Sequence, residues 1–233
     1  MLFSVALALA AVVFVALLLF ILPIAYLGAP PPGFGEAFLL TALFSGAAAG
    51  LGLLPGLAVA VWGRGGWQAA VAQILYAPAV VPPTAVGVLL LAAFRNPLLP
   101  EWLYGFFVNK AAGVLLAMFV MALPVSYAVF DGALKDVRAE LYFRSLGLGG
   151  LRLLVALLLS LKRATAAAFL LSFLRGFGEL GVLLIFASYP PTMSIYIYQA
   201  FLQEGLGATV AASMAVAALG VSTAYLLRLW LSR

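Results

Sequence analysis

The sequence predicts an all-α polytopic membrane protein with six transmembrane helices and both termini in the cytoplasm. Hydrophobic residues make up 67% of the 233 residues and charged residues only 8%, whereas charged residues make up roughly 25% of a soluble domain. Six segments are each long and apolar enough for a bilayer-spanning helix, which needs roughly 20 residues. Most Lys and Arg residues fall in loops on one side of these segments. The chain has too few polar groups to cover a water-exposed surface, so lipid surrounds most of it.

The first predicted helix spans roughly residues 2–27 and carries no charge. It has no basic n-region and is too long for the apolar core of a signal peptide, so we expect it to be retained. The Pro-rich segment 29–33 ends it, because Pro cannot continue a helix. The second helix runs roughly over 37–62, and the turn Arg64-Gly65-Gly66 follows it.

The third predicted helix, roughly 68–94, contains Pro78, Pro82 and Pro83. Each Pro removes a backbone donor and crowds the preceding turn. Such interruptions survive at membrane depth only where neighbouring helices or a cavity satisfy the freed carbonyls. We therefore expect this helix to pack inside the bundle. Residues 95–109 are expected to form an external loop with a short helix.

The second half of the chain holds three more predicted helices. The fourth runs roughly over 110–130, and a charged segment over 131–163 separates it from the fifth. The fifth runs roughly over 164–187. After the loop 188–206, the sixth runs roughly over 207–228.

The distribution of cations sets the orientation of these helices, because cytoplasmic loops carry an excess of Lys and Arg. With six spans both ends lie on one side, and that side holds nine cations against two on the other. The nine are Arg64, Lys135, Arg138, Arg144, Arg152, Lys162, Arg163, Arg228 and Arg233, and the two are Arg95 and Lys110. This distribution places both termini in the cytoplasm and leaves Arg175 inside the fifth helix.

Missing residue types exclude several classes of activity. The chain has no Cys and no His, which excludes disulfides, thiolate or imidazole metal sites, and catalysis by a Ser–His pair or a Cys. A phosphate-cradling loop needs Gly-Lys-Ser/Thr, and none of the three Lys residues follows a Gly. We therefore expect no catalytic residue, no bound cofactor and no metal on this chain.

The charged segment after the fourth helix predicts a short amphipathic helix at the cytoplasmic membrane surface. Glu140 and Arg144 are spaced i,i+4 with the Glu first, which is the favoured order for a helical ion pair. Gly147 is a natural helix stop. An ordinary basic loop held near anionic lipid is the alternative interpretation.

The same segment resembles the cytoplasmic coupling loop of ABC-importer permeases, whose consensus is Glu-Ala-Ala, three residues, Gly, nine residues and Ile-x-Leu-Pro. In an alignment on Gly147, residues 141–143 stand at the Glu-Ala-Ala positions and Glu140 falls one place early. Residues 157–160 match the aliphatic positions of Ile-x-Leu-Pro but not its Pro. The residues that this resemblance assigns to an ATPase-coupling helix are Arg138, Glu140, Arg144, Ser145 and Gly147.

Three further stretches resemble the molybdate and tungstate permeases among these proteins, in consistent order over roughly residues 36–228. Residues 77–87 are similar to their Pro-rich third helix, and residues 173–186 are similar to their fifth helix. Residues 188–206 are similar to the loop before their last helix.

The resemblance implies the membrane-spanning permease subunit of a type I ABC importer for molybdate or tungstate, in a prokaryotic cell membrane. It implies three partners: a second copy of the chain, two cytoplasmic ATPase subunits that bind ATP and Mg²⁺, and an external oxyanion-binding protein. Nucleic acid is not an expected partner. Residues 1–35 are then the first helix and its external turn, 36–228 the ABC-importer-type transmembrane domain, and 229–233 a cytoplasmic tail. The alternatives are a permease for sulfate, thiosulfate or phosphate, and a secondary transporter or channel that works without ATP.

Two charged residues lie inside the predicted fifth helix, where burying either alone is costly. Arg175 and Glu179 are spaced i,i+4, so we expect an ion pair in the bundle interior that lines or gates the translocation path. A structural ion pair that fixes helix packing is the alternative. The candidate residues of the path or gate are Pro82, Pro83, Thr84, Arg175, Gly178 and Glu179.

The loop 188–206 offers hydroxyl groups but no Lys or Arg. Hydroxyls can donate hydrogen bonds to an oxyanion without holding it tightly. The candidates in this external loop are Tyr189, Thr192 and Tyr196. An interfacial aromatic belt is the alternative role for the Tyr residues.

Overall fold

The computed structural model describes residues 2–136 and 139–231, and the fold is all-α over these residues. Within them, four helices are long and apolar enough to cross a membrane, or up to six if each of two bent helix pairs is one span. The chain is therefore an all-α polytopic membrane protein, as the sequence predicts. The helices in chain order are α1 (Leu2–Ala16), η1 (Leu17–Ile21), η2 (Leu22–Tyr26), α2 (Phe34–Trp62), α3 (Gly66–Ala72), η3 (Gln73–Tyr76), α4 (Ala77–Val80), α5 (Pro83–Phe94), α6 (Glu101–Phe107), α7 (Ala111–Asp136), α8 (Ala139–Ser145), α9 (Gly150–Ser160), α10 (Lys162–Phe177), α11 (Gly181–Phe186), α12 (Met193–Glu204) and α13 (Leu206–Leu231).

Helices α2, α7 and α10 form the centre of the bundle, where small side chains let them approach closely. Ser126 Oγ of α7 lies 2.9 Å from Ser172 Oγ of α10, and Ser172 donates to the Ala122 carbonyl at 3.1 Å. A Cβ added to Gly56 of α2 would lie 2.8 Å from the Ser126 Cβ. Small residues at helix contacts and hydroxyls that bond across helices are typical of helix packing in lipid.

The third predicted helix is broken rather than continuous. Helices α3, η3 and α4 cover residues 66–80, and α5 leaves them at an angle of 112°. The break includes Pro82, whose ψ is 133°. Pro83 forces this conformation, because a residue before Pro is pushed out of the helical region. The expected packing inside the bundle is found only in part, since Val86 is buried whereas Val80 is 81% exposed.

The fifth predicted helix is also interrupted. Helix α10 ends at Phe177 and α11 begins at Gly181, so residues 164–187 do not form one helix. Helix α9 precedes α10 and meets it at an angle of 90°. The fourth helix, α7, runs on to Asp136 instead of ending near residue 130.

The segment 188–206, which the sequence predicts to be a loop, is mostly the helix α12. This helix is stabilised by burial of Met193, Ile195 and Ala200. The main-chain N–H of Met193 also donates to Thr41 Oγ1 of α2 at 2.6 Å. The prediction of a loop was wrong because the clustered Tyr and Pro residues are typical of loops, and the apolar face formed by the buried residues was overlooked.

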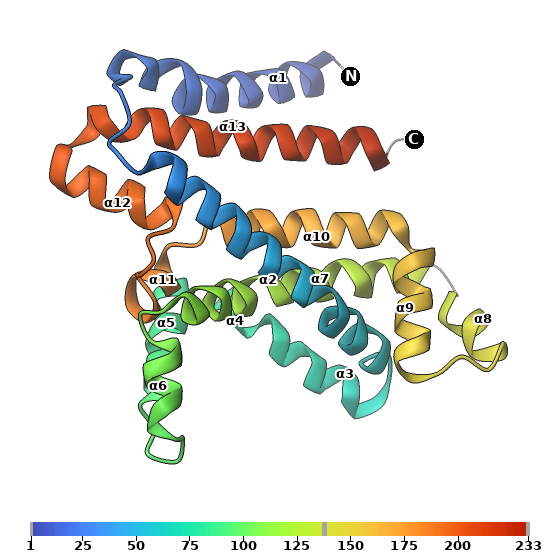
Figure 1. Cartoon of the computed structure of the whole chain (residues 1–233). Helices are drawn as coiled ribbons and strands as arrows, with labels where there is room; N and C mark the ends of the chain where they lie inside the picture. The colour runs from blue at the N-terminus through green and yellow to red at the C-terminus, as the bar shows by residue number, and fades with distance from the viewer. Residues whose placement is uncertain (1, 137–138, 232–233) are drawn as a thin grey trace.

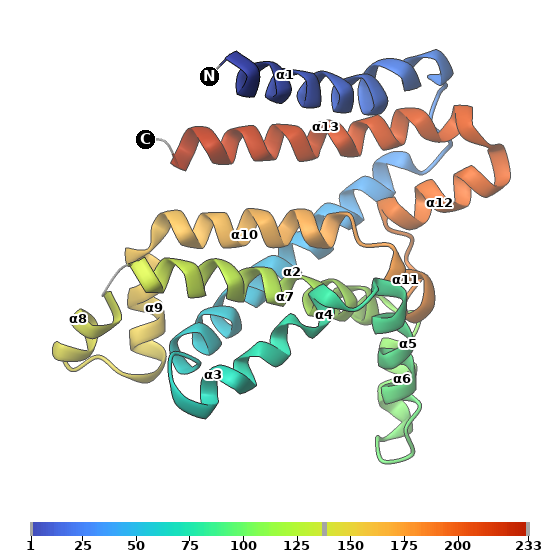
Figure 2. The same ribbon diagram turned by 180° about the vertical axis from the view of Figure 1, so that it is seen from behind.

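The ends of the long helices define two faces of the molecule. The start of α1, the end of α13 and helix α8 lie at one end, and α12 lies at the other (Figures 1 and 2). Helix α8 and the outer ends of α1 and α13 thus lie at the same end of the molecule, and the side of the membrane on which they lie stays a prediction. None of the most apolar part of Ser4–Tyr26 is buried by the rest of the chain. Its apolar surface is therefore left for lipid or another chain to cover.

Candidate functional site

Glu179 lies in the break between α10 and α11, and its carboxylate joins the two helices. Its Oε2 lies 2.6 Å from Arg175 Nη1 of α10. Its Oε1 accepts the main-chain N–H of Val182, in the first turn of α11, at 2.9 Å. The Glu179 side chain is 1% exposed and that of Arg175 is 31% exposed. The predicted ion pair is therefore formed, but it spans a helix break and also satisfies a free N–H at a helix start.

Helix α5, which follows the break at Pro82, meets α11 next to Glu179. A Cβ added to Gly181 would lie 2.7 Å from the Pro83 Cβ and 3.0 Å from the Thr84 nitrogen. A Cβ added to Gly87 would lie 3.1 Å from the Ile185 Cβ. The start of α5 thus packs directly against α11, and the glycines permit this close approach.

The candidate path residues divide into two groups in this junction. Glu179 is buried and holds α10 to α11, whereas Pro82, Thr84 and Gly178 are exposed on the surface of the single chain. Gly178 ends α10, and its N–H donates to the Leu174 carbonyl at 3.1 Å. The junction therefore offers an accessible surface beside a fixed charge pair.

Helix α8 is anchored through a buried carboxylate. Glu140 Oε2 lies 2.6 Å from Arg64 Nη1, beyond the end of α2, and Glu140 Oε1 lies 2.8 Å from Arg144 Nε. Arg64 also donates to the Leu134 carbonyl of α7. The Glu140 residue is 6% exposed. Glu140 therefore positions α8 against α2 and α7 and does not present an exposed charge.

Large apolar and aromatic side chains are exposed on α8 and its turn, beside Arg144 and Ser145. Leu141, Tyr142 and Leu146 are each about 60% exposed. Gly147 ends the helix with φ at +79°, the left-handed region that favours Gly at a helix end. Ser145 Oγ donates to the Tyr142 carbonyl at 2.7 Å, which stabilises the last turn. Arg138, which the sequence analysis includes in this helix, lies outside the described residues.

Sequence reasoning finds the Glu140–Arg144 spacing but misses Arg64, the second partner of Glu140. Only the position of Arg64 in a turn on the same predicted side as residues 131–163 points to such a contact. It also misses Leu141, Tyr142 and Leu146, which charge patterns do not single out.

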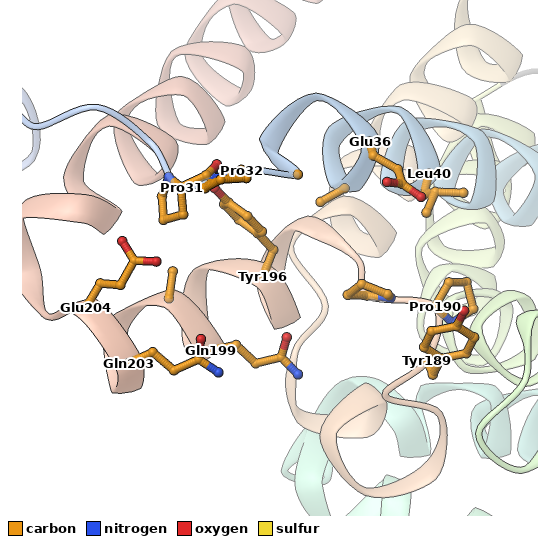
Figure 3. A pocket seen from close by; sticks show the side chains of 14 residues that line it. Pro31, Pro32, Glu36, Leu40, Tyr189, Pro190, Tyr196, Gln199, Gln203 and Glu204 are labelled. Atoms are coloured by element: carbon orange, nitrogen blue, oxygen red, sulfur yellow. The ribbon is translucent and has the colours of Figure 1, made fainter.

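At the opposite end of the molecule, a cavity of about 400 Å³ lies between the Pro-rich segment before α2 and helix α12 (Figure 3). Tyr189 and Tyr196 line it, together with Glu36 and Glu204. Tyr196 donates its hydroxyl hydrogen to the Pro31 carbonyl. Burial raises the pKa of Tyr196, and the charge of Glu204 adds to this.

The third candidate of this region lies beside the cavity and is closed to solvent. Thr192 is 1% exposed, and its Oγ1 forms no hydrogen bond with the described residues. Two carboxylates and no Lys or Arg line the cavity, so its charge disfavours an oxyanion. The structure brings Tyr189 and Tyr196 together here, but in surroundings that do not suit the anion expected from the sequence.

Curated proteins with similar sequences are permease proteins. The molybdate/tungstate transport system permease protein of Methanocaldococcus jannaschii is 27% identical over 163 residues, which are 69% of this chain and 66% of that protein. Its counterpart from Pyrococcus abyssi is 29% identical over 69% of this chain and 62% of its own length. The molybdenum transport system permease protein of Escherichia coli K12 is 34% identical over 51% of this chain and 56% of its own length.

The alignments cover less than two thirds of the length of each of these three relatives. No protein-family model matches the chain. The matches nevertheless confirm the resemblance that the motifs predict: this chain is similar in sequence to the permease proteins of molybdate and tungstate transport systems.

Proposed function

We propose that this chain is the membrane-spanning permease subunit of an ATP-driven importer for molybdate or tungstate in a prokaryotic cell membrane. It works as a pair of identical copies with two cytoplasmic ATPase subunits and an external oxyanion-binding protein. ATP and Mg²⁺ bind to the ATPase subunits and not to this chain. The similarity to molybdate and tungstate permeases carries the proposal.

Helix α8 supplies the contact with the ATPase. It lies beyond the ends of the long helices (Figure 1) and exposes Leu141, Tyr142 and Leu146. Large exposed apolar side chains on a short helix suit a hydrophobic groove on a partner. Glu140 ties this helix to both Arg64 and Arg144, so a displacement of α8 by the ATPase is passed to the end of α2.

The junction of α5 with α11 supplies the gate. Two interrupted spans meet there, and irregular backbone at membrane depth is tolerated where it is covered by protein or lines a water-filled cavity. The Arg175–Glu179 pair fixes the α10–α11 connection, while Pro82, Thr84 and Gly178 face outward, toward the second copy. Arg175 does not bind the anion directly in this scheme, because Glu179 neutralises it and would repel an anion.

The first test is purification of the tagged chain in mild detergent, followed by mass spectrometry of the proteins that accompany it. We expect a P-loop ATPase at equal stoichiometry. A variant with Leu141→Ser, Tyr142→Ala and Leu146→Ser should lose this ATPase, while Tyr189→Ala at the opposite end should keep it. A self-associated chain without any ATPase would contradict the proposal and favour a secondary transporter or channel.

The substrate is tested on the complex reconstituted in proteoliposomes with its binding protein. We expect ATP-dependent uptake of labelled molybdate or tungstate. Uptake of sulfate, thiosulfate or phosphate in preference to both would retain the importer and overturn its assigned substrate.

A further inference from the structure

Helix α9 lies across the direction of the spanning helices. It meets α10 at 90°, and Figures 1 and 2 show it crossing the end of α10, with α8 farther out. In both views α10 runs nearly parallel to the candidate span α13, so α9 lies close to parallel to the membrane surface when α13 crosses a bilayer.

One face of α9 packs on the bundle and the other is apolar but uncovered. Leu153 and Leu157 are buried, at 3% and 0% exposed. Leu151, Val155 and Leu159 are 66%, 43% and 66% exposed. These three residues are spaced i,i+4,i+8 and form one stripe along the helix. A stripe of this kind facing water would be unfavourable, so something apolar covers it.

The charged residues around this stripe are all positively charged. Arg152, Lys162 and Arg163 are all exposed, and none of them forms an ion pair with a described residue. The sequence has no acidic residue between Leu141 and Gly178.

Two acidic side chains described near this end of the molecule are already neutralised by other cations. Glu140 pairs with Arg64 and Arg144, and Asp131 pairs with Lys135. Among the residues that the structure describes, no acidic side chain pairs with the cations beside the stripe.

We propose that α9 is an interfacial helix whose stripe Leu151, Val155 and Leu159 enters the headgroup boundary of the bilayer. Arg152, Lys162 and Arg163 hold anionic lipid headgroups there. Interfacial helices combine an apolar face with flanking cations in this way, and cations near the surface attract anionic lipid. This inference rests on the chain spanning a membrane and not on its proposed transport function.

The proposed contact between α9 and lipid is tested with a single nitroxide label on α9. The labelling is simple because the sequence has no Cys. The label is attached to Val155→Cys in the full chain, reconstituted in vesicles of phosphatidylcholine with and without phosphatidylglycerol. We expect the label to collide with oxygen more often than with a water-soluble nickel complex. The matched control is Tyr142→Cys on α8, where the nickel complex should dominate.

The headgroup contact is tested by thermal unfolding in the same vesicles. Phosphatidylglycerol should raise the unfolding midpoint of the unaltered chain by about 6–12 °C, as expected for three contacts between cations and headgroups on a chain of this size. The variant Arg152→Gln/Lys162→Gln/Arg163→Gln should lose this rise, whereas Arg95→Gln/Lys110→Gln at the other end should keep it.

Four results would overturn the inference. The first is a water-accessible label at residue 155, and the second is a label there that is closed to both reagents because protein covers it. The third is an equal phosphatidylglycerol shift in the triple variant. A label that becomes immobile only when the ATPase is added would assign the stripe to that subunit instead of to lipid.

Discussion

The side chains of Arg64 and Glu140 meet at 2.6 Å although the two residues are 76 positions apart in the chain. This ion pair connects the end of α2 to α8, and Arg144 completes it from within α8. The segment that resembles the coupling loop is therefore fixed to the bundle by a contact that also satisfies a buried charge.

Arg64→Gln should detach α8 from α2. Removing one partner of a buried ion pair costs about 3–5 kcal/mol, and the partial exposure of Arg64 reduces this to about 2 kcal/mol. We expect a lower thermal unfolding midpoint and loss of the ATPase in co-purification. The control Lys135→Gln removes an exposed pair and should change neither quantity. A normal midpoint for Arg64→Gln would mean that the pair does not hold α8.

Arg175→Ala should leave the Glu179 carboxylate buried and unpaired, and should impair assembly or transport. The variant Arg175→Ala/Glu179→Gln should recover much of the loss, because the Gln carbonyl can still accept the Val182 N–H without a charge. Arg175→Ala/Glu179→Ala removes the charge and this acceptor together, so it should fall between the other two. The amount of folded protein in detergent and the uptake rate measure the effect. If neither double variant exceeds the single one, the two residues do not act as a pair.

Gly181→Ala should push α5 away from α11. The added Cβ would lie 2.7 Å from the Pro83 Cβ and 3.0 Å from the backbone nitrogen of Thr84, and backbone cannot move aside cheaply. We expect a loss of about 1–3 kcal/mol of stability, as for other overpacked sites, and reduced uptake. Gly50→Ala in α2 is the matched control, since nothing lies within 4 Å of its added Cβ. Similar behaviour of the two variants would argue against a tight α5–α11 contact.

Gly147→Val should strain the turn after α8 through its backbone, because φ is +79° and no atom lies within 4 Å of the added Cβ. Positive φ is unfavourable for β-branched residues and costs on the order of 1–3 kcal/mol. We expect ATP hydrolysis to continue with less uptake per ATP, at normal expression. Gly149→Val has the same free space at a negative φ and should preserve the ratio. Unchanged ratios of ATP hydrolysed to anion taken up in proteoliposomes would disprove this role for Gly147.

Some local features of the fold were predictable from the sequence, although the helix α12 and the break after α10 were not, and the long-range contacts were not predictable. The spacing of Arg175 and Glu179, the stop at Gly147 and the apolar spans follow from neighbours in the chain. The bend at Pro82 could have been predicted from the same Pro residues that were identified as interruptions, but its size depends on packing against α11. The partner of Glu140 could not be predicted, because nothing local links residues 64 and 140.

The two interrupted spans have a mechanical consequence. Helix α5 packs on α11 through Gly87 and Gly181, and each of the two helices joins its own span at a break between helices. The pair can therefore pivot as one body about residues 81–82 and 178–180. Such a rotation leaves the turns of α5 and α11 intact, and the backbone contact that it strains is the bond from the Glu179 N–H to the Gly176 carbonyl. The Glu179 carboxylate then holds the pair closed, because it bonds across one of the two pivots to both an Arg side chain and a main-chain N–H.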